Sequence, residues 1–79
     1  MTFGERLKKI RQSVQKSQKQ IQIETGIPQT TLSGWENDIS EPTASDIIKL
    51  ATVFNITVTQ LLEGDEETDQ AATTERQAG

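Results

Sequence analysis

The 79-residue sequence contains no cysteine and no histidine. Without cysteine the chain forms no disulfide and offers no thiol for chemistry, which suits a cytoplasmic protein. Without histidine it lacks the commonest acid–base catalyst and the commonest metal ligand. No phosphate-cradling glycine loop and no recognisable pair of catalytic carboxylates takes their place. The sequence therefore argues against an enzyme and predicts neither a metal nor a cofactor.

Long apolar runs are also missing. No stretch approaches the roughly 20 apolar residues that cross a membrane, and no signal peptide is evident at the start. Apolar residues make up 32% of the chain and aromatic residues 4%. We therefore expect one small domain with a modest core and no membrane partner.

Positive charge is scarce but unevenly distributed. The formal net charge is −4, which is the wrong sign for a protein that binds nucleic acid. However, residues 1–49 carry seven Lys and Arg residues against six acidic residues, whereas residues 50–79 carry one Arg against six acidic residues. The negative balance therefore belongs to the end of the chain, and residues 1–49 carry a formal charge of +1.

What the sequence does contain is a succession of short helices. A Ser or Thr followed three residues later by Glu, Asp or Gln, the signature of a capping box, occurs at Thr2, Ser17, Thr43 and Thr57. Apolar residues at helical spacing follow these positions, and no strand pattern competes. The sequence thus predicts an all-α fold of five helices. We expect core residues on all of them, with Ile39 as an anchor in the link after residue 37 and with Val58, Leu61 and Leu62 closing the core.

Residues 17–37 join two of these helices through a tight turn. The first helix is expected to end near Thr25, because Gly26 readily adopts the left-handed conformation that terminates helices. Pro28 suits the start of the second helix, where no backbone donor is needed. A short helix, a glycine turn and a second helix form the pattern of DNA-binding helix-turn-helix motifs.

The second of these helices has two unlike sides. Its inward side is formed by Leu32, Trp35 and Glu36, and its other side is small, polar and uncharged, formed by Gln29, Thr30, Ser33 and Asn37. The amide of Gln29 can pair with adenine at N6 and N7, which discriminates by roughly 1–3 kcal/mol. Thr30 and Thr31 offer a hydroxyl for a phosphate and a methyl for thymine. The amides near Ser17, flanked by Lys16 and Lys19, suit a phosphate.

The composition changes after Gly64. Residues 65–79 contain Asp, Glu, Thr, Gln, Ala and Gly but no large apolar residue. Such a segment buries too little surface to offset its ordering entropy. We predict a helix-turn-helix domain over residues 1–64, followed by a disordered acidic tail or linker over residues 65–79.

Residues 3–64 resemble the lambdoid phage repressor-like helix-turn-helix domain of the xenobiotic-response-element family of transcriptional regulators. The resemblance rests on an ordered set of positions: Arg6, Arg11, Gln18, Ile21, Gly26-Ile27, Leu32, Trp35-Glu36-Asn37, Pro42, Leu50-Ala51, Phe54-Asn55-Ile56 and Leu61-Leu62. It implies a compact five-helix fold with the helix-turn-helix at helices 2 and 3. It also implies a third helix that enters the DNA major groove, usually in a homodimer on a twofold-symmetric operator.

The resemblance also implies roles for individual residues. Gln18 matches a position that reaches the DNA backbone while bracing the third helix, and Asn37 matches another backbone contact. Gln29 and Thr30 match base-contacting positions, with Ser33 and Gly34 one turn further along. Arg11 and Glu36 match a partly buried structural pair. The expected DNA-binding set is thus Gln18, Lys19, Gln29, Thr30, Thr31, Ser33, Gly34 and Asn37.

Two departures from the family pattern stand out. Gly34 replaces a side chain that often reads a base, so direct readout is poorer there or the bare backbone lies close to the DNA. Gln22 replaces a small apolar residue beside Ile21, which suggests different packing between the second and third helices.

Two functions from different classes fit the pattern. The favoured one is a sequence-specific transcriptional regulator, a repressor that blocks a promoter and binds weakly as a monomer because basic residues are few. The alternative is an antitoxin or a protein-interaction module that binds a protein partner through the last helix, with DNA binding secondary. The uncharged surface at Gln29 and Thr30 distinguishes them, since only the regulator needs it.

Overall fold

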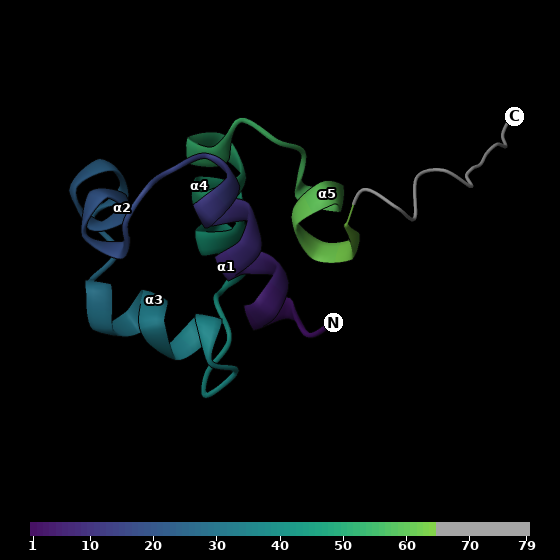
Figure 1. Ribbon diagram of the computed structural model, residues 1–79, viewed down its shortest axis with the longest axis horizontal. Helices are drawn as coiled ribbons and strands as arrows, with labels where there is room; N and C mark the ends of the chain where they lie inside the picture. Colours follow the sequence, from purple (N-terminus) through teal and green to yellow (C-terminus); the bar gives the residue numbers. More distant parts are fainter. Residues whose placement is uncertain (65–79) are drawn as a thin grey trace, which may run out of the picture.

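The computed structural model describes residues 1–64, and that part of the chain is all-helical. Its five helices are α1 (Phe3–Ser13), α2 (Gln18–Thr25), α3 (Gln29–Glu36), α4 (Ala44–Phe54) and α5 (Val58–Glu63). Figure 1 shows α2 and α3 together at one end of the molecule, α1 and α4 in the middle and α5 at the other end. The five-helix prediction is confirmed. The tail predicted over residues 65–79 lies outside the described residues.

Local side-chain chemistry sets most helix boundaries. The side chains of Thr2, Thr43 and Thr57 each accept a backbone hydrogen bond, and the third helical residue of each helix reaches back to the cap backbone. The predicted fourth capping box is only half formed. Ser17 accepts from the Gln20 N–H at 3.0 Å, but the Gln20 side chain donates instead to Glu24 at 2.6 Å. A complete box would need the Gln20 side-chain oxygen to accept from the Ser17 N–H, whereas its Nε2 makes a charge-assisted hydrogen bond to the Glu24 carboxylate.

The core runs through the middle of the described domain. It consists of Leu7, Ile21, Ile27, Leu32, Trp35, Ile47, Leu50, Ala51, Phe54 and Leu61, with Phe3, Ile10, Val14, Val53 and Ile56 packed against it. Each helix contributes, so burying the core fixes the orientation of all five. Trp35 is 3% exposed and belongs to this core, as its position beside Leu32 predicted.

Several apolar residues expected inside lie outside. Ile39 is 80% exposed and does not anchor the link after α3, while Leu62 and Val58 are exposed on α5 and only Leu61 closes the core. A six-residue helix presents one narrow face to its neighbours, so adjacent apolar residues cannot all be buried. No helix among residues 1–64 is both long and apolar enough to cross a membrane.

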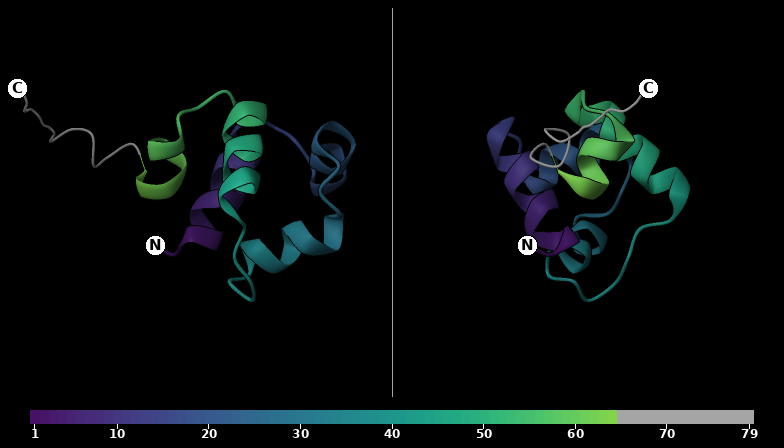
Figure 2. Two further views of the ribbon diagram at one scale, coloured as in Figure 1. Left: turned by 180° about the vertical axis from the view of Figure 1, so that it is seen from behind. Right: turned by 90° about the vertical axis from the view of Figure 1, so that its right-hand side faces the viewer.

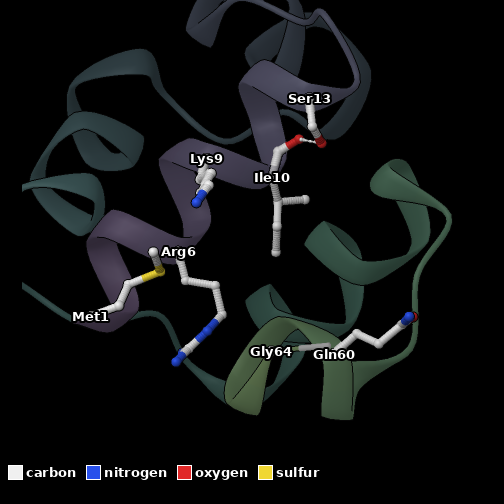
Figure 3. Close-up of a pocket in the computed structure, with 7 residues that line it drawn as sticks. All are labelled: Met1, Arg6, Lys9, Ile10, Ser13, Gln60 and Gly64. Carbon is white, nitrogen blue, oxygen red and sulfur yellow. Dashed lines mark hydrogen bonds between the residues drawn. The ribbon is translucent and has the colours of Figure 1, made fainter. Parts of the chain in front are cut away.

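Two long-range contacts hold α1 to its neighbours. Near its N-terminus, Asp38 accepts from the Gly4 N–H at 2.9 Å and from the Thr2 hydroxyl at 2.6 Å. On the other side, Arg6 Nη1 donates to the Leu62 carbonyl at 2.8 Å, and Figure 3 shows this side chain extending from α1 toward α5. Arg6 is half-buried, and its side chain fastens α5 to α1.

Candidate nucleic-acid interface

The turn between α2 and α3 is built as its sequence predicted. Gly26 ends α2 in the left-handed conformation, with φ of 80°. The Thr25 hydroxyl donates to the Ile21 carbonyl at 2.7 Å and accepts from the Ile27 N–H at 3.1 Å. The Ile27 side chain is buried in the core. These contacts fix the angle between the two helices, so that α3 runs along the lower side of the molecule in Figure 1, from below α2 toward α1 (Figures 1 and 2).

The outer side of α3 is polar and open to solvent. Gln29, Thr30 and Asn37 are exposed, whereas Thr31, Ser33 and Gly34 are half-buried. On α2, Lys19 is exposed and Gln18 half-buried. All eight expected DNA-binding residues therefore lie on α2, on α3 or directly after α3. No charged side chain stands among the positions of α3 from Gln29 to Gly34, so hydrogen bonding rather than charge would dominate contacts there.

A buried ion pair supports this surface from behind. Arg11 Nε lies 2.6 Å from Glu36 Oε2 and Arg11 Nη2 lies 3.1 Å from Oε1, a two-point contact between α1 and α3. Arg11 is 9% exposed and Glu36 is 6% exposed. Arg11 Nη1 also donates to the Lys16 carbonyl at 2.8 Å, which ties in the link before α2. The pair thus fixes three segments of the helix-turn-helix relative to one another.

Gln18 connects this pair to the exposed surface. Its Nε2 donates to Glu36 Oε1 at 3.0 Å, and its Oε1 lies 3.4 Å from Gln29 Nε2 as a weak acceptor. Gln18 therefore braces α3, and through Gln29 it reaches the residue placed first on that helix. The position of Gln18 agrees with the bracing role that the family resemblance implies.

Gln22 makes a contact with α3 that the sequence did not predict. Its side-chain Oε1 accepts a hydrogen bond from the Gln29 backbone N–H at 2.7 Å. The sequence marked Gln22 only as a departure that alters packing between α2 and α3. Pro28 was the sequence feature that could have indicated this contact. It precedes α3 and has no side-chain acceptor for the first amides of the helix, so an acceptor from elsewhere in the chain was to be expected.

The C-terminal end of α3 is closed by its own residues. Asn37 Nδ2 donates to the Ser33 carbonyl at 2.8 Å, and the Gly34 carbonyl accepts from the Ile39 N–H at 2.9 Å. A Cβ at Gly34 would lie 3.1 Å from Ser40 Oγ. The turn after α3 therefore crowds this glycine.

The two lysines expected near a phosphate differ in their surroundings. Lys16 Nζ lies 2.7 and 2.8 Å from the two carboxylate oxygens of Glu24, so its charge is already paired. Hydrogen bonds from Lys16 and Gln20 lower the pKa of Glu24. Lys19 is exposed at the start of α2 and is the better placed of the two for a phosphate. Among residues 1–64, no group of three or more acidic side chains could hold a metal ion.

Comparison with known proteins places this arrangement among helix-turn-helix proteins. A family model described as helix-turn-helix matches residues 7–61. The chain is 33% identical over 66 residues to the HTH-type transcriptional regulator ImmR of Bacillus subtilis (strain 168), covering 84% of this chain and 52% of that protein. It is 31% identical over 67 residues to the HTH-type transcriptional regulator DicA of Escherichia coli (strain K12), covering 85% and 50%. The chain thus spans about half the length of these curated relatives.

Two solved structures have the same fold as this chain. The P22 c2 repressor in complex with a synthetic operator superposes with a TM-score of 0.75 at 25% identity, covering 82% of this chain and 98% of that one. The restriction-modification controller protein C.AhdI from Aeromonas hydrophila superposes with a TM-score of 0.72 at 28% identity, covering 76% and 91%. The arrangement of all five helices is therefore that of lambda-repressor-like domains, as the sequence resemblance implied.

Proposed function

Because this chain belongs to the helix-turn-helix family, we propose that it is a sequence-specific regulator of transcription that binds double-stranded DNA and represses by covering a promoter. The observation that carries the proposal is the exposed, uncharged edge formed by Gln29 and Thr30 and braced by Gln18 against the buried Glu36. The names of its relatives as transcriptional regulators, and the operator bound to the P22 c2 repressor, support it.

The contacts divide into reading and positioning. The N-terminal half of α3 enters the major groove, where the Gln29 amide pairs with an adenine edge and the Thr30 side chain contacts a neighbouring base. Gln18, Lys19, Thr31 and Asn37 contact the phosphates on either side, with Ser33 and Gly34 at the groove edge. Because the described basic residues are few, phosphate contacts alone give weak binding, and specificity depends on the α3 edge.

The first test is selection of bound duplexes from a randomised DNA library, at low salt and near physiological salt. We expect a twofold-symmetric motif whose half-sites lie about one helical turn, roughly 34 Å, apart. Recovery of sequence-blind, salt-sensitive binding alone would contradict the proposal and favour a protein-interaction module.

Replacing Gln29 and Thr30 together by alanine should abolish preference for the selected operator. Losing one two-point base contact alone costs about 1–3 kcal/mol, a factor of roughly 5–150 in affinity. Both side chains are exposed, so the melting temperature should barely change. Fluorescence anisotropy with labelled operator measures the loss. Gln12→Ala with Thr59→Ala, which removes the same side-chain types from exposed sites on α1 and α5, should bind like the unaltered protein.

The proposal includes a homodimer on the operator. A groove of about 410 Å³ lies between the start of α1, the link after α3 and α5, and its apolar lining includes Phe3, Ile39, Pro42, Ile47 and Leu62. Ile39 is 80% exposed and Leu62 47% exposed. Apolar side chains gathered at one groove favour an interaction site over random exposure. A second copy of the chain that covers this groove would join two half-site readers, so that the second half-site is bound at a high effective concentration.

Replacing Ile39 and Leu62 by serine should weaken self-association and lower affinity for the full operator by about tenfold or more. Binding to an isolated half-site should be unchanged, because neither residue belongs to the proposed reading edge. Sedimentation equilibrium and operator titrations measure the two effects. Ile48→Ser, at an exposed apolar position on α4, is the matched control. Equal losses on the half-site and the full operator would contradict this dimer surface.

A further inference from the structure

The start of α3 is capped differently from the other four helices. Each of α1, α2, α4 and α5 begins after a Ser or Thr whose side chain accepts a backbone N–H, whereas α3 begins after Pro28, which has no such side chain. The first amides of a helix have no acceptor within the helix. At α3 the acceptor comes from the preceding helix, as Gln22 Oε1 lies 2.7 Å from the Gln29 nitrogen.

This contact places Gln29 between two other glutamines. Gln22 holds its backbone N–H, and Gln18 lies 3.4 Å from its side-chain Nε2. The 2.7 Å bond is short and the 3.4 Å bond is long, so the backbone contact is the stronger restraint. Gln22 therefore fixes the backbone from which the Gln29 side chain extends, whereas Gln18 contacts the side-chain amide itself.

The direction of the Gln22 amide follows from the chemistry of its partner. A backbone N–H can only donate, so the oxygen of Gln22 must face it and the Nε2 group must face away. Within residues 1–64 no hydrogen bond uses that Nε2 group, and the residue is exposed. Gln22 is not one of the core residues, and the side-chain hydrogen bond that it forms within residues 1–64 is to the backbone of the proposed reading residue.

We propose that Gln22 is a positioning residue for base readout. By holding the first backbone amide of α3, it fixes the point from which the Gln29 side chain extends to make a two-point contact with one base pair. The inference rests on the proposed DNA-binding function and adds to it a determinant of specificity outside α3. Small misplacements of a two-point hydrogen bond are costly, because both bonds need near-linear geometry.

The test compares base preferences rather than affinity alone. Gln29→Ala first identifies the base pair that Gln29 reads, as the position where preference is lost. Gln22→Ala should then lower the preference at that same base pair by about tenfold while leaving the other positions of the operator unchanged. The double variant should lose no more preference there than Gln29→Ala does, since the two residues act through one contact.

Two further variants separate positioning from stability. Gln22→Glu keeps a capping oxygen, so the base preference should be retained, while its negative charge should lower affinity for all sequences alike. Gln20→Ala, an exposed glutamine on the same helix, should leave the preference unchanged. Circular dichroism melting of each variant confirms that the fold is intact.

The outcomes are distinct. Relaxed preference at one base pair in Gln22→Ala, recovered in Gln22→Glu, supports the inference. An unchanged preference profile, or a uniform fall in affinity across all sequences in Gln22→Ala, overturns it while leaving DNA-binding regulation intact. If the unaltered protein shows no base preference, the proposed function itself fails and the inference fails with it.

Discussion

Replacing Glu36 by alanine is expected to lower the free energy of unfolding by about 3–5 kcal/mol. Glu36 is 6% exposed, and its carboxylate accepts from Arg11 Nε at 2.6 Å, from Arg11 Nη2 at 3.1 Å and from Gln18 Nε2 at 3.0 Å. Without it, a buried guanidinium loses its counter-charge and a half-buried amide loses its acceptor. Leaving a buried charge unpaired costs more than the ion pair itself contributes.

This loss is a large fraction of the free energy of unfolding of such a small domain. Single domains are stable by about 5–15 kcal/mol, and small ones lie toward the low end because they bury less of their surface. Urea unfolding followed by Trp35 fluorescence measures the change, since this tryptophan is the only one in the chain and is buried. We expect the Glu36→Ala domain to be partly unfolded at physiological temperature and to lose operator binding.

Two comparisons isolate the buried pair. Glu24→Ala breaks the exposed Lys16–Glu24 pair and should change stability little, because water screens that contact. Arg11→Met combined with Glu36→Met removes both charges and should recover much of the loss. If Glu36→Ala were no more destabilising than Glu24→Ala, the burial of the Arg11–Glu36 contact would be contradicted.

The helices were predictable because their signals are local. The N-caps Thr2, Thr43 and Thr57 each bond a residue three positions later in the sequence. Gly26 ends α2 because glycine readily adopts the left-handed backbone conformation. The periodicity of Leu32 and Trp35 likewise separated the buried side of α3 from its exposed side, which placed Gln29 and Thr30 on the surface. That these residues contact DNA stays a prediction.

The features that sequence reasoning missed all depend on residues that meet only in the folded chain. Arg6 bonds a carbonyl 56 residues away on α5, and Gln22 caps a helix that it does not belong to. Neither pairing has a fixed spacing that a motif could record. Ile39 failed as a core residue for a related reason, because apolar character alone does not determine whether the folded chain buries a side chain.

The second large effect is expected at Gly4, near the start of α1. A Cβ there would lie 2.5 Å from the Glu36 carbonyl oxygen, 2.6 Å from that of Trp35 and 2.8 Å from Asp38 Oδ1. The first two atoms belong to the backbone and cannot rotate away. Alanine at this position should therefore destabilise the domain by about 3 kcal/mol through overpacking, although alanine is intrinsically the better helix former by about 1 kcal/mol.

Gly34→Ala provides the matched control, because Gly34 is also a helical glycine and lies on α3 itself. Its Cβ would meet only the Ser40 hydroxyl at 3.1 Å, an exposed side chain that can rotate. Gly34→Ala should leave stability unchanged or raise it by up to about 1 kcal/mol. If urea unfolding shows that Gly4→Ala lowers the free energy of unfolding and Gly34→Ala raises it, the close approach of α1 to the end of α3 is supported. Equal effects would mean that helix propensity dominates at both sites and that the two helices are further apart than described. Because the Gly4 contact holds the C-terminal end of α3 while Gln22 holds its N-terminal end, the orientation of the proposed reading helix depends on both.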